Sequence, residues 1–251
     1  MAEIYLYPLL ILVGFTVGFI NTLAGGGSVI SLSFLIFMGL PSSVANGTNR
    51  IAIVISNTMA VAGFRSKKVS TTPFSIYLGL SAILGALIGA QIAVDMNNAI
   101  FNRVLAIVMI VVLLLIVFKP KLNADEMIEE LYGKKLRVSI PVFFVLGIYG
   151  GFINAGIGFL IILFLHYYHK MSLVRVNASK VMIVLIYSAA SLLVFIFNDK
   201  VDWMVGLIMA TGNALGAWVS SRVSVKKGDG FIKTFLVLMI LIMAIRLWFF
   251  S

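Results

Sequence analysis

A basic residue follows a short run of polar side chains in an otherwise apolar part of the chain. Arg50 comes directly after Asn46-Gly47-Thr48-Asn49 and directly before the apolar stretch 51–55. A guanidinium group binds oxyanions through two parallel hydrogen bonds, and amide and hydroxyl groups add neutral donors. Because Arg50 is expected to open a helix, the helix dipole would strengthen its positive potential. The pattern favours a site for an oxyanion; the alternative is an arginine that reaches from a helix end to water.

A second basic residue stands at the matching place in the other half of the chain. Thr48-Asn49-Arg50 aligns with Ala178-Ser179-Lys180, so a basic residue opens the third apolar segment of each half. The second copy lacks the Asn-Gly-Thr-Asn context that precedes Arg50. We therefore expect the anion to be bound mainly from the Arg50 side.

Two asparagines and two glycine-bearing breaks also occupy matching places. Asn21 lies ahead of Gly25-Gly26-Gly27, and Asn154 lies ahead of Gly156-Ile157-Gly158. An amide there donates either to a substrate or to the unwound backbone of its own helix, and the breaks either line a cavity or form tight hairpin tips. Ser28 is placed to cap the short helix that follows the first break. The candidate substrate-binding residues are Asn21, Gly25, Gly26, Gly27, Ser28, Thr48, Asn49, Arg50, Asn154, Ser179 and Lys180.

An internal repeat supplies the elements that must position these groups. The stretch 14–21, Gly-Phe-Thr-Val-Gly-Phe-Ile-Asn, returns at 147–154 as Gly-Ile-Tyr-Gly-Gly-Phe-Ile-Asn. Four Gly-x-x-x-Gly motifs, at 14–18, 85–89, 147–151 and 212–216, predict close helix crossings. Repeated apolar halves are typical of membrane proteins that bind a solute between the halves. We expect an N-terminal repeat at 1–118, a linker at 119–137 and a C-terminal repeat at 138–251.

The composition places both halves in a membrane. The chain has 251 residues, of which 61% are hydrophobic and 11% charged, and its mean hydropathy is +1.11. Soluble domains are about 45–50% apolar and about 25% charged. We predict an all-α integral membrane protein with about eight to ten segments, because a span needs about 20 residues. Two short apolar runs, 28–40 and 158–169, follow the glycine breaks and predict discontinuous helices.

Basic residues are concentrated in three loops, at 65–68, in the linker 119–137 and at 222–233. Because Lys and Arg stay on the cytoplasmic side of membranes, the linker is predicted inside and both chain ends outside. The two halves then enter the membrane with opposite polarity, which predicts inverted-topology repeats in a multi-pass protein of the cell (inner) membrane. The same placement accounts for the net charge of +10 without a nucleic acid partner.

The sequence lacks the residues that several other functions would need. No Asp or Glu lies inside an apolar segment away from its ends, which argues against a carboxylate proton relay. No Ser-His-Asp set, nucleophile elbow or phosphate-binding loop occurs, so we expect neither an enzyme nor a nucleotide-driven pump, and no cofactor. The absence of cysteine excludes thiolate metal sites. His166 and His169 lack a third metal ligand, and we expect them at the membrane interface.

At these motifs the sequence resembles the TauE/SafE family of sulfite-exporter-like permeases. The resemblance rests on Gly14-x-x-x-Gly18-Phe19-Ile20-Asn21 through Ala24-Gly25-Gly26-Gly27-Ser28 and on Ala45-Asn46-Gly47-Thr48-Asn49-Arg50, and it extends over nearly the whole chain. It implies transport of a small sulfur-containing or organic anion such as sulfite, a sulfonate or sulfoacetate. One segment departs from the family pattern, because Gly156-Ile157-Gly158-Phe159 holds fewer glycines than the family's usual second copy.

The leading hypothesis is a secondary transporter whose two halves move around a small anion held between them. An anion channel with the same basic lining is the alternative, and the sequence features are the same for both. A membrane enzyme or assembly factor lacks a catalytic constellation. The expected partners are the small anion and the lipid bilayer. A homo-oligomer is compatible with the sequence, which does not indicate the oligomeric state.

Overall fold

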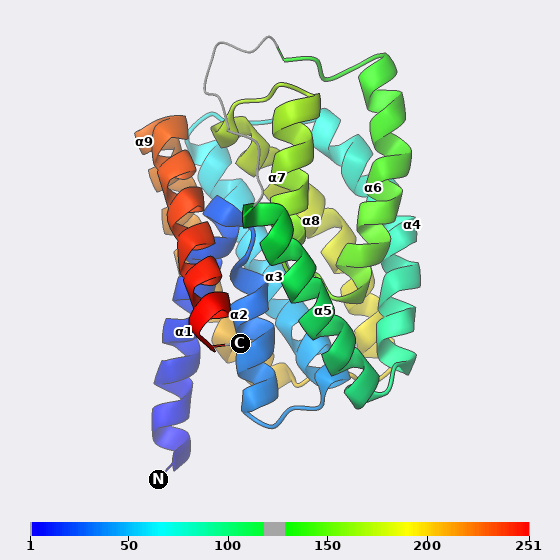
Figure 1. Ribbon diagram of the computed structural model, residues 1–251, viewed down its shortest axis with the longest axis vertical. Helices are drawn as coiled ribbons and strands as arrows, with labels where there is room; N and C mark the ends of the chain where they lie inside the picture. The colour runs from blue at the N-terminus through cyan, green and yellow to red at the C-terminus, as the bar shows by residue number, and fades with distance from the viewer. Residues whose placement is uncertain (1, 118–128, 251) are drawn as a thin grey trace.

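The computed structural model describes residues 2–117 and 129–250, which form helices joined by short turns (Figure 1). In chain order these helices are α1 (Ala2–Ala24), α2 (Gly27–Phe37), α3 (Ser42–Ser66), α4 (Phe74–Asp95), α5 (Asn98–Val117), α6 (Lys134–Phe152), α7 (Ile157–Tyr168), α8 (Leu173–Phe197) and α9 (Trp203–Phe250). Gly228 interrupts α9 with φ 72° and ψ −171°, so two helical stretches meet there at a kink.

Five stretches of the described residues are long and apolar enough to cross a membrane. They are Leu6–Ala24, Phe74–Asp95, Lys134–Phe152, Leu173–Phe197 and Trp203–Leu236. Large apolar side chains such as Leu12 and Leu84 are 63% and 64% exposed, whereas Arg50 is fully buried. Apolar groups outside and charged groups inside are the arrangement that a lipid environment favours. The prediction of a multi-pass, all-α membrane protein is confirmed.

Two pairs of helices form hairpins that turn back inside the molecule. α1 reverses into the 11-residue α2 at Gly25, and α6 reverses into the 12-residue α7 at Gly156. Both glycines have positive φ, +80° and +73°, where a side chain is strained. The two turns touch, since a Cβ added at Gly25 would lie 2.4 Å from Cα of Gly158. The discontinuous helices predicted from the sequence are present, and their tips meet in the interior.

The Gly-x-x-x-Gly motifs join the two halves of the chain. Gly14 and Gly18 of α1 pack against the backbone of α9, where Gly212 and Gly216 pack back onto α1. Similarly, Gly85 and Gly89 of α4 face α6, whose Gly147 and Gly151 face α4. A Cβ at any of these eight glycines would come within 2.4 Å of a backbone oxygen of the facing helix. The first helix of each half therefore packs closely on the fourth helix of the other half, as the motifs predict.

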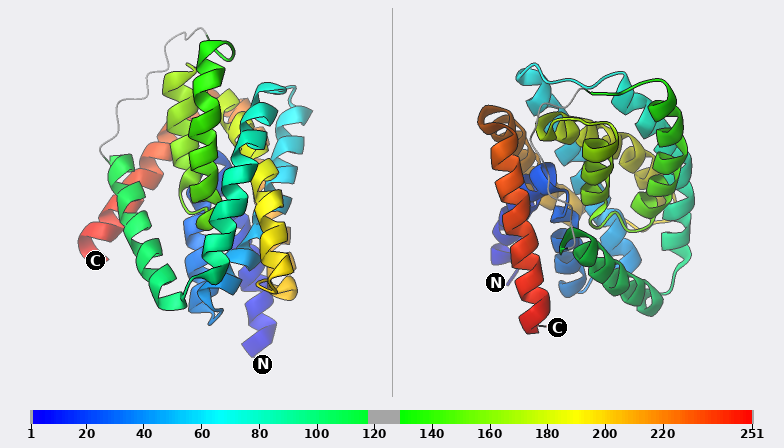
Figure 2. Two further views of the ribbon diagram at one scale, coloured as in Figure 1. Left: turned by 90° about the vertical axis from the view of Figure 1, so that its right-hand side faces the viewer. Right: turned by 45° about the horizontal axis from the view of Figure 1, so that its top comes forward.

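The halves run in opposite directions. α1 rises from the N-terminus in Figures 1 and 2, whereas α6 descends from the opposite end. α3 and α8 are also antiparallel, because Arg50 near the start of α3 contacts Ser191 near the end of α8, and Phe64 near the end of α3 packs with Ala178. This arrangement supports inverted repeats; the repeat limits at 118 and 138 stay predictions.

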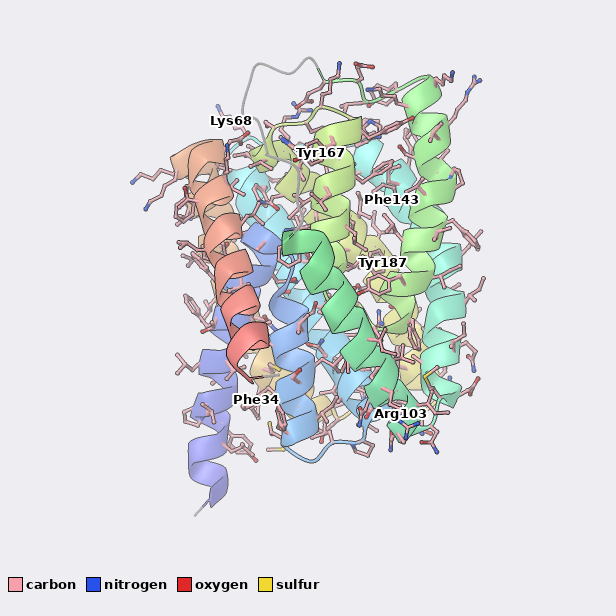
Figure 3. The ribbon with its side chains drawn as sticks, viewed as in Figure 1. Phe34, Lys68, Arg103, Phe143, Tyr167 and Tyr187 are labelled. Carbon is pink, nitrogen blue, oxygen red and sulfur yellow. The ribbon has the colours of Figure 1, made fainter. Side chains whose placement is uncertain are left out.

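One end of the molecule carries most of the described basic residues, and we call it the basic end. α3 and α7 end there, α6 and α8 begin there, and Lys68 and Tyr167 mark it in Figure 3, with Arg103 at the other end. Glu130, within the predicted linker, forms ion pairs with Lys135 and Lys170 at this end. The charge rule makes the basic end cytoplasmic, which stays a prediction.

Candidate functional site

Arg50 holds the end of a helix from the other half of the chain. Its side chain on α3 is fully buried, and Nη1 donates to Oγ of Ser191 at 2.7 Å. Nη2 donates to the carbonyl oxygens of Gly150, at 3.0 Å, and Gly151. These carbonyls belong to the last turn of α6, where no backbone partner is left for them. The negative end of the helix dipole also stabilises a cation at this position.

Two expectations for Arg50 are therefore wrong. α3 begins at Ser42, so Arg50 lies two turns inside the helix and not at its N-terminus. Its positive potential gains nothing from the N-terminal dipole of α3. The alternative, a side chain that reaches water from a helix end, is excluded by its full burial. The largely polar segment 42–49 forms the first two turns of α3, although the apolar run begins only after it.

Lys180 does the same for the first half. Its ammonium on α8 is buried and donates to the carbonyl oxygens of Asn21, at 3.0 Å, and Thr22, at 2.8 Å. A third bond joins Nζ to Oδ1 of Asn177 at 2.8 Å. Asn21 and Thr22 lie in the last turn of α1. Each half therefore places a basic side chain on the end of the other half's broken helix.

An asparagine assists each basic residue. Asn46, one turn before Arg50, donates from Nδ2 to the carbonyl of Phe152 at 2.7 Å. Asn177, one turn before Lys180, donates from Nδ2 to the carbonyl of Leu23 at 3.1 Å. We call Arg50 and Asn46 on α6 the Arg50 clamp, and Lys180 and Asn177 on α1 the Lys180 clamp. The sequence alone did not single out these asparagines as site residues. Their spacing of one turn before a basic residue is nevertheless a pattern that places both side chains on one helix face.

Carboxylates do not balance the two buried cations within the part of the chain that the structure describes. The ion pairs there join Glu130 to Lys135 and Lys170, and Glu129 to Arg175. Neither Asp nor Glu occurs among the described buried polar residues. Helix-end carbonyls are the main compensation for Arg50 and Lys180, and the ring of Phe195 lies 5.0 Å from the guanidinium carbon. Burying a charge without an ionic partner is costly, so the interior keeps a positive potential.

Several buried polar atoms on α3 and α8 lack a hydrogen-bond partner. They include Oδ1 and Nδ2 of Asn49, Nε of Arg50 and Oδ1 of Asn46 on α3, and Oγ of Ser179 on α8. Such atoms are rare in folded proteins, and each calls for an explanation. Three of the residues are sequence-predicted site residues, and two of these, Asn49 and Ser179, occupy matching places of the repeat. A bound polar molecule is the kind of partner that would satisfy them.

The structure gives other predicted site residues protein partners. Oγ1 of Thr48 accepts from the backbone N–H of Asp202 at 2.9 Å, which fixes the loop after α8. Ser28 does not cap α2, because its hydroxyl donates to the carbonyl of Asn154 at 2.8 Å. Asn154, with φ +60°, accepts at Oδ1 from the hydroxyl of Tyr187 at 2.6 Å. Tyr187 lies in the interior between the two ends (Figure 3). These bonds join the two hairpins to each other and to α8.

The first glycine break is closely packed. Gly25 lies against Gly158, a Cβ at Gly26 would lie 2.5 Å from the ring of Phe159, and one at Gly27 would meet the carbonyl of Val17 on α1. Gly27 already belongs to α2, so the turn itself comprises only residues 25 and 26. The break is thus an interior contact between the hairpins.

The two histidines lie inside the basic end and not at an exposed interface. His166 and His169 are 3% and 0% exposed. Nδ1 of His169 is 2.6 Å from the carbonyl oxygen of Glu130, and Nε2 is 2.7 Å from Oγ of Ser139. Burial lowers the pKa of His169. Glu130 and Ser139 of α6 cover the last turn of α7, so His169 contacts protein groups there. A position at the depth of the membrane interface stays a prediction.

The sequence model of the family described as Sulfite exporter TauE/SafE matches residues 10–247. The chain belongs to the TauE/SafE family. It is 27% identical to a "Probable membrane transporter protein" of Haemophilus influenzae over 242 residues, 96% of this chain and 94% of the relative. It is 26% identical to "Probable membrane transporter protein ORF9" of Sinorhizobium sp, over 97% of this chain and 92% of the relative. It is also 26% identical to "Probable membrane transporter protein YfcA" of Escherichia coli K12, over 98% and 91%.

No solved structure matches the chain. Membership of the TauE/SafE family and the names of these relatives make the chain a multi-pass membrane transporter of the TauE/SafE type and not an enzyme. A transporter needs a polar site inside the membrane, and the two clamps are among the buried polar groups of the described residues.

Proposed function

We propose that the chain is a secondary transporter for a small sulfur-containing or organic anion, such as sulfite, a sulfonate or sulfoacetate, bound between its two halves. The observation that carries this proposal concerns the described residues. Among them, the two buried cations have no carboxylate partner and lie beside polar atoms that lack hydrogen bonds. The family description, which names a sulfite exporter, agrees with an anionic substrate.

The charge of the interior favours an anion over other substrates. A cation would be repelled by Arg50 and Lys180, and a neutral molecule would leave both charges without an ionic partner. Nε of Arg50 and Nδ2 of Asn49 are donors without acceptors, on adjacent residues of α3. These two groups are donors of the kind that oxygen atoms of sulfite or a sulfonate require.

Anion binding in this proposal also loosens a helix end. An oxyanion is a stronger acceptor for a guanidinium than a carbonyl oxygen is. An anion that engages Arg50 competes with Gly150 and Gly151 for its Nη2 group. Release of these carbonyls frees the end of α6 and its hairpin with α7. Because a ligand shifts a conformational equilibrium through its different contacts in the two states, this competition links binding to movement of the halves.

Asn49 provides the sharpest test, because its side chain has no protein partner to lose. In a merely structural protein, Asn49→Leu should keep or raise the melting temperature, since an unsatisfied buried amide is removed. If Asn49 binds the anion, the variant should fold at least as well and lose roughly tenfold in affinity for sulfite or ethanesulfonate, measured by titration calorimetry on purified protein.

Asn57→Leu is the matched control on the same helix. Asn57 is buried, and its Nδ2 already donates to the carbonyl of Ile53 at 2.8 Å. We expect it to leave anion affinity unchanged. Equal anion binding by the wild type, Asn49→Leu and Asn57→Leu would remove the proposed site. Anion flux under voltage clamp separates a carrier from a channel of the same architecture, because a channel passes far more charge per protein.

A further inference from the structure

A recess opens at the basic end, between the end of α3 and the start of α8. Its volume is about 220 Å³ including the part open to solvent. Phe64 and Arg65 of α3, Ser70 and Thr72 of the following loop, and Ala178 and Met182 of α8 line it. None of these residues belongs to the clamps.

The mouth of the recess is polar and positive. Arg65 is exposed and forms no ion pair with any described residue. Oγ of Ser70 and Oγ1 of Thr72 are 3.0 Å apart, so one of the two hydroxyls donates to the other. The second hydroxyl hydrogen of this pair remains able to donate to a ligand. A guanidinium and a free hydroxyl donor are groups that bind an oxyanion such as sulfite.

The floor of the recess adjoins the candidate site. Ala178, on the floor, directly precedes Ser179, whose buried Oγ lacks a partner, and Lys180, which holds α1. Phe64 and Ala178, which line the recess, belong to one small apolar cluster with Val181. A ligand in the recess would therefore lie against Ala178, which directly follows Asn177 of the Lys180 clamp.

The matching place at the opposite end is closed. Gly47, one turn from the start of α3, packs so tightly on the loop after α8 that a Cβ would lie 2.0 Å from the carbonyl oxygen of Lys200. Thr48 is bonded to Asp202 of the same loop. The inverted halves thus differ at their equivalent ends, with a recess at one and closed packing at the other.

We infer that this recess is an entry site that binds the transported anion class, a small oxyanion, at the basic end before it reaches the clamps. The inference rests on the proposed function and adds a second, peripheral binding position with its own residues. Arg65 supplies the charge there, and the pair Ser70 and Thr72 supplies the hydroxyl donor. The cluster of Phe64, Ala178 and Val181 forms the barrier that must part for the anion to move inward.

The chain has no cysteine, so a single introduced thiol reports on the recess alone. Met182→Cys and Val69→Cys place a thiol on its lining, from α8 and from the loop. Tyr132→Cys is the control, because Tyr132 is exposed and precedes α6 at the same basic end, outside the recess. Each variant is labelled with an anionic (ethylsulfonate) and a cationic (ethyltrimethylammonium) methanethiosulfonate reagent, with and without ethanesulfonate as competitor.

We expect the ratio of anionic to cationic labelling rates to be about tenfold higher at Met182→Cys than at Tyr132→Cys, since a positive recess concentrates anions. Ethanesulfonate should slow labelling at Met182→Cys and Val69→Cys and leave Tyr132→Cys unchanged. Adding Arg65→Gln should remove both effects. Equal ratios at the three positions, no protection by ethanesulfonate, or no labelling of either recess thiol in folded protein would overturn the inference.

Calorimetry with the central-site variants separates this inference from the proposed function. Asn49-dependent anion binding without protection of the recess thiols removes the entry site and leaves the proposed function. Protection of the recess thiols that depends on Arg65, with anion binding unaffected at Asn49, removes the central site and supports a peripheral oxyanion site.

Discussion

The two clamps solve one structural problem with different chemistry. Each holds the last-turn carbonyls of a broken helix from the other half, and each pairs a basic residue with an asparagine one turn earlier. Lys180 has three N–H bonds to give and places all three on Asn21, Thr22 and Asn177. Arg50 occupies Nη1 and Nη2 but leaves Nε without a partner. The lysine clamp is complete, whereas the arginine clamp keeps a donor in reserve.

The neighbouring residue strengthens this difference. Asn49, next to Arg50, offers an amide donor and acceptor without partners, whereas Ser179, next to Lys180, offers one hydroxyl. In the proposed function, the Arg50 side therefore binds the anion, and the Lys180 side mainly holds α1. The one-sided site, expected from the polar context before Arg50, stays a prediction.

Replacing the two basic residues in parallel should have the largest effect on this comparison. Arg50→Gln removes the guanidinium, and a lost charge-assisted contact costs about 1.5–3 kcal/mol, or roughly ten- to hundredfold in affinity for ethanesulfonate. Lys180→Gln should change the affinity little, because all donors of Lys180 are used within the protein. Both should lower the melting temperature, because helix-end carbonyls lose their partner. Comparable losses of affinity in calorimetry would show that the site is two-sided.

Gly158→Ala tests whether the two clamped hairpins must meet. A Cβ at Gly158 would lie 2.3 Å from Cα of Gly25, a backbone contact that cannot relax by a side-chain rotation. Overpacking of this kind costs about 1–3 kcal/mol, so thermal unfolding should occur at a clearly lower temperature. Gly230→Ala is the control, because nothing lies within 4 Å of a Cβ there. An unchanged melting temperature of Gly158→Ala would mean that the hairpin tips lie further apart.

Ser191→Ala sharpens the role of the free donor. Ser191 accepts from Nη1 of Arg50, and its removal leaves a second guanidinium nitrogen without a partner. The anion-free protein should lose stability, while a bound anion would satisfy the freed nitrogen. We expect ethanesulfonate affinity to rise by about fivefold, which corresponds to about 1 kcal/mol. Ser224→Ala, which removes a local bond to the carbonyl of Ser221 on α9, should leave the affinity unchanged. A fall in affinity for Ser191→Ala would instead make Ser191 itself a ligand of the anion.

The sequence predicted the parts of this molecule that are written in local patterns. The short helices, the breaks at Gly25 and Gly156 and the close crossings at the Gly-x-x-x-Gly motifs follow from apolar run length and glycine spacing. The start of α3 was misplaced because residues 42–49 are polar but helical, and an apolar run does not mark a helix start inside a protein. Two of the polar side chains there, those of Asn46 and Thr48, form hydrogen bonds with the other half of the chain.

The partners of the clamps could not be predicted, for a different reason. Arg50 binds carbonyls about 100 residues away, and Lys180 binds carbonyls 158 and 159 residues away. Backbone carbonyls carry no sequence signal, since every residue has one. The last carbonyls of a broken helix need hydrogen-bond donors, and this need alone indicates that a basic residue must come from another part of the chain. The sequence thus identified Arg50 and Lys180 as equivalent candidate binding residues, but not the helix ends that they hold.

The smallest effect that we predict concerns pH at the basic end. Burial lowers the pKa of His169, so the folded protein holds this ring neutral, between the carbonyl of Glu130 and the hydroxyl of Ser139. The unfolded chain, with a histidine pKa of about 6.5, binds more protons below that pH. The contribution of His169 to stability is therefore present above about pH 6.5 and declines as the pH falls toward the lower folded pKa. The ammonium of Lys135 lowers the pKa of His169 as burial does, and the hydrogen bond to the Glu130 backbone and the Glu130 carboxylate raise it.

The melting temperature of the wild type should fall slightly more between pH 7 and pH 5 than that of His169→Gln, which has no ring to protonate. Parallel pH profiles of the two proteins would show that the ring is already charged in the folded protein.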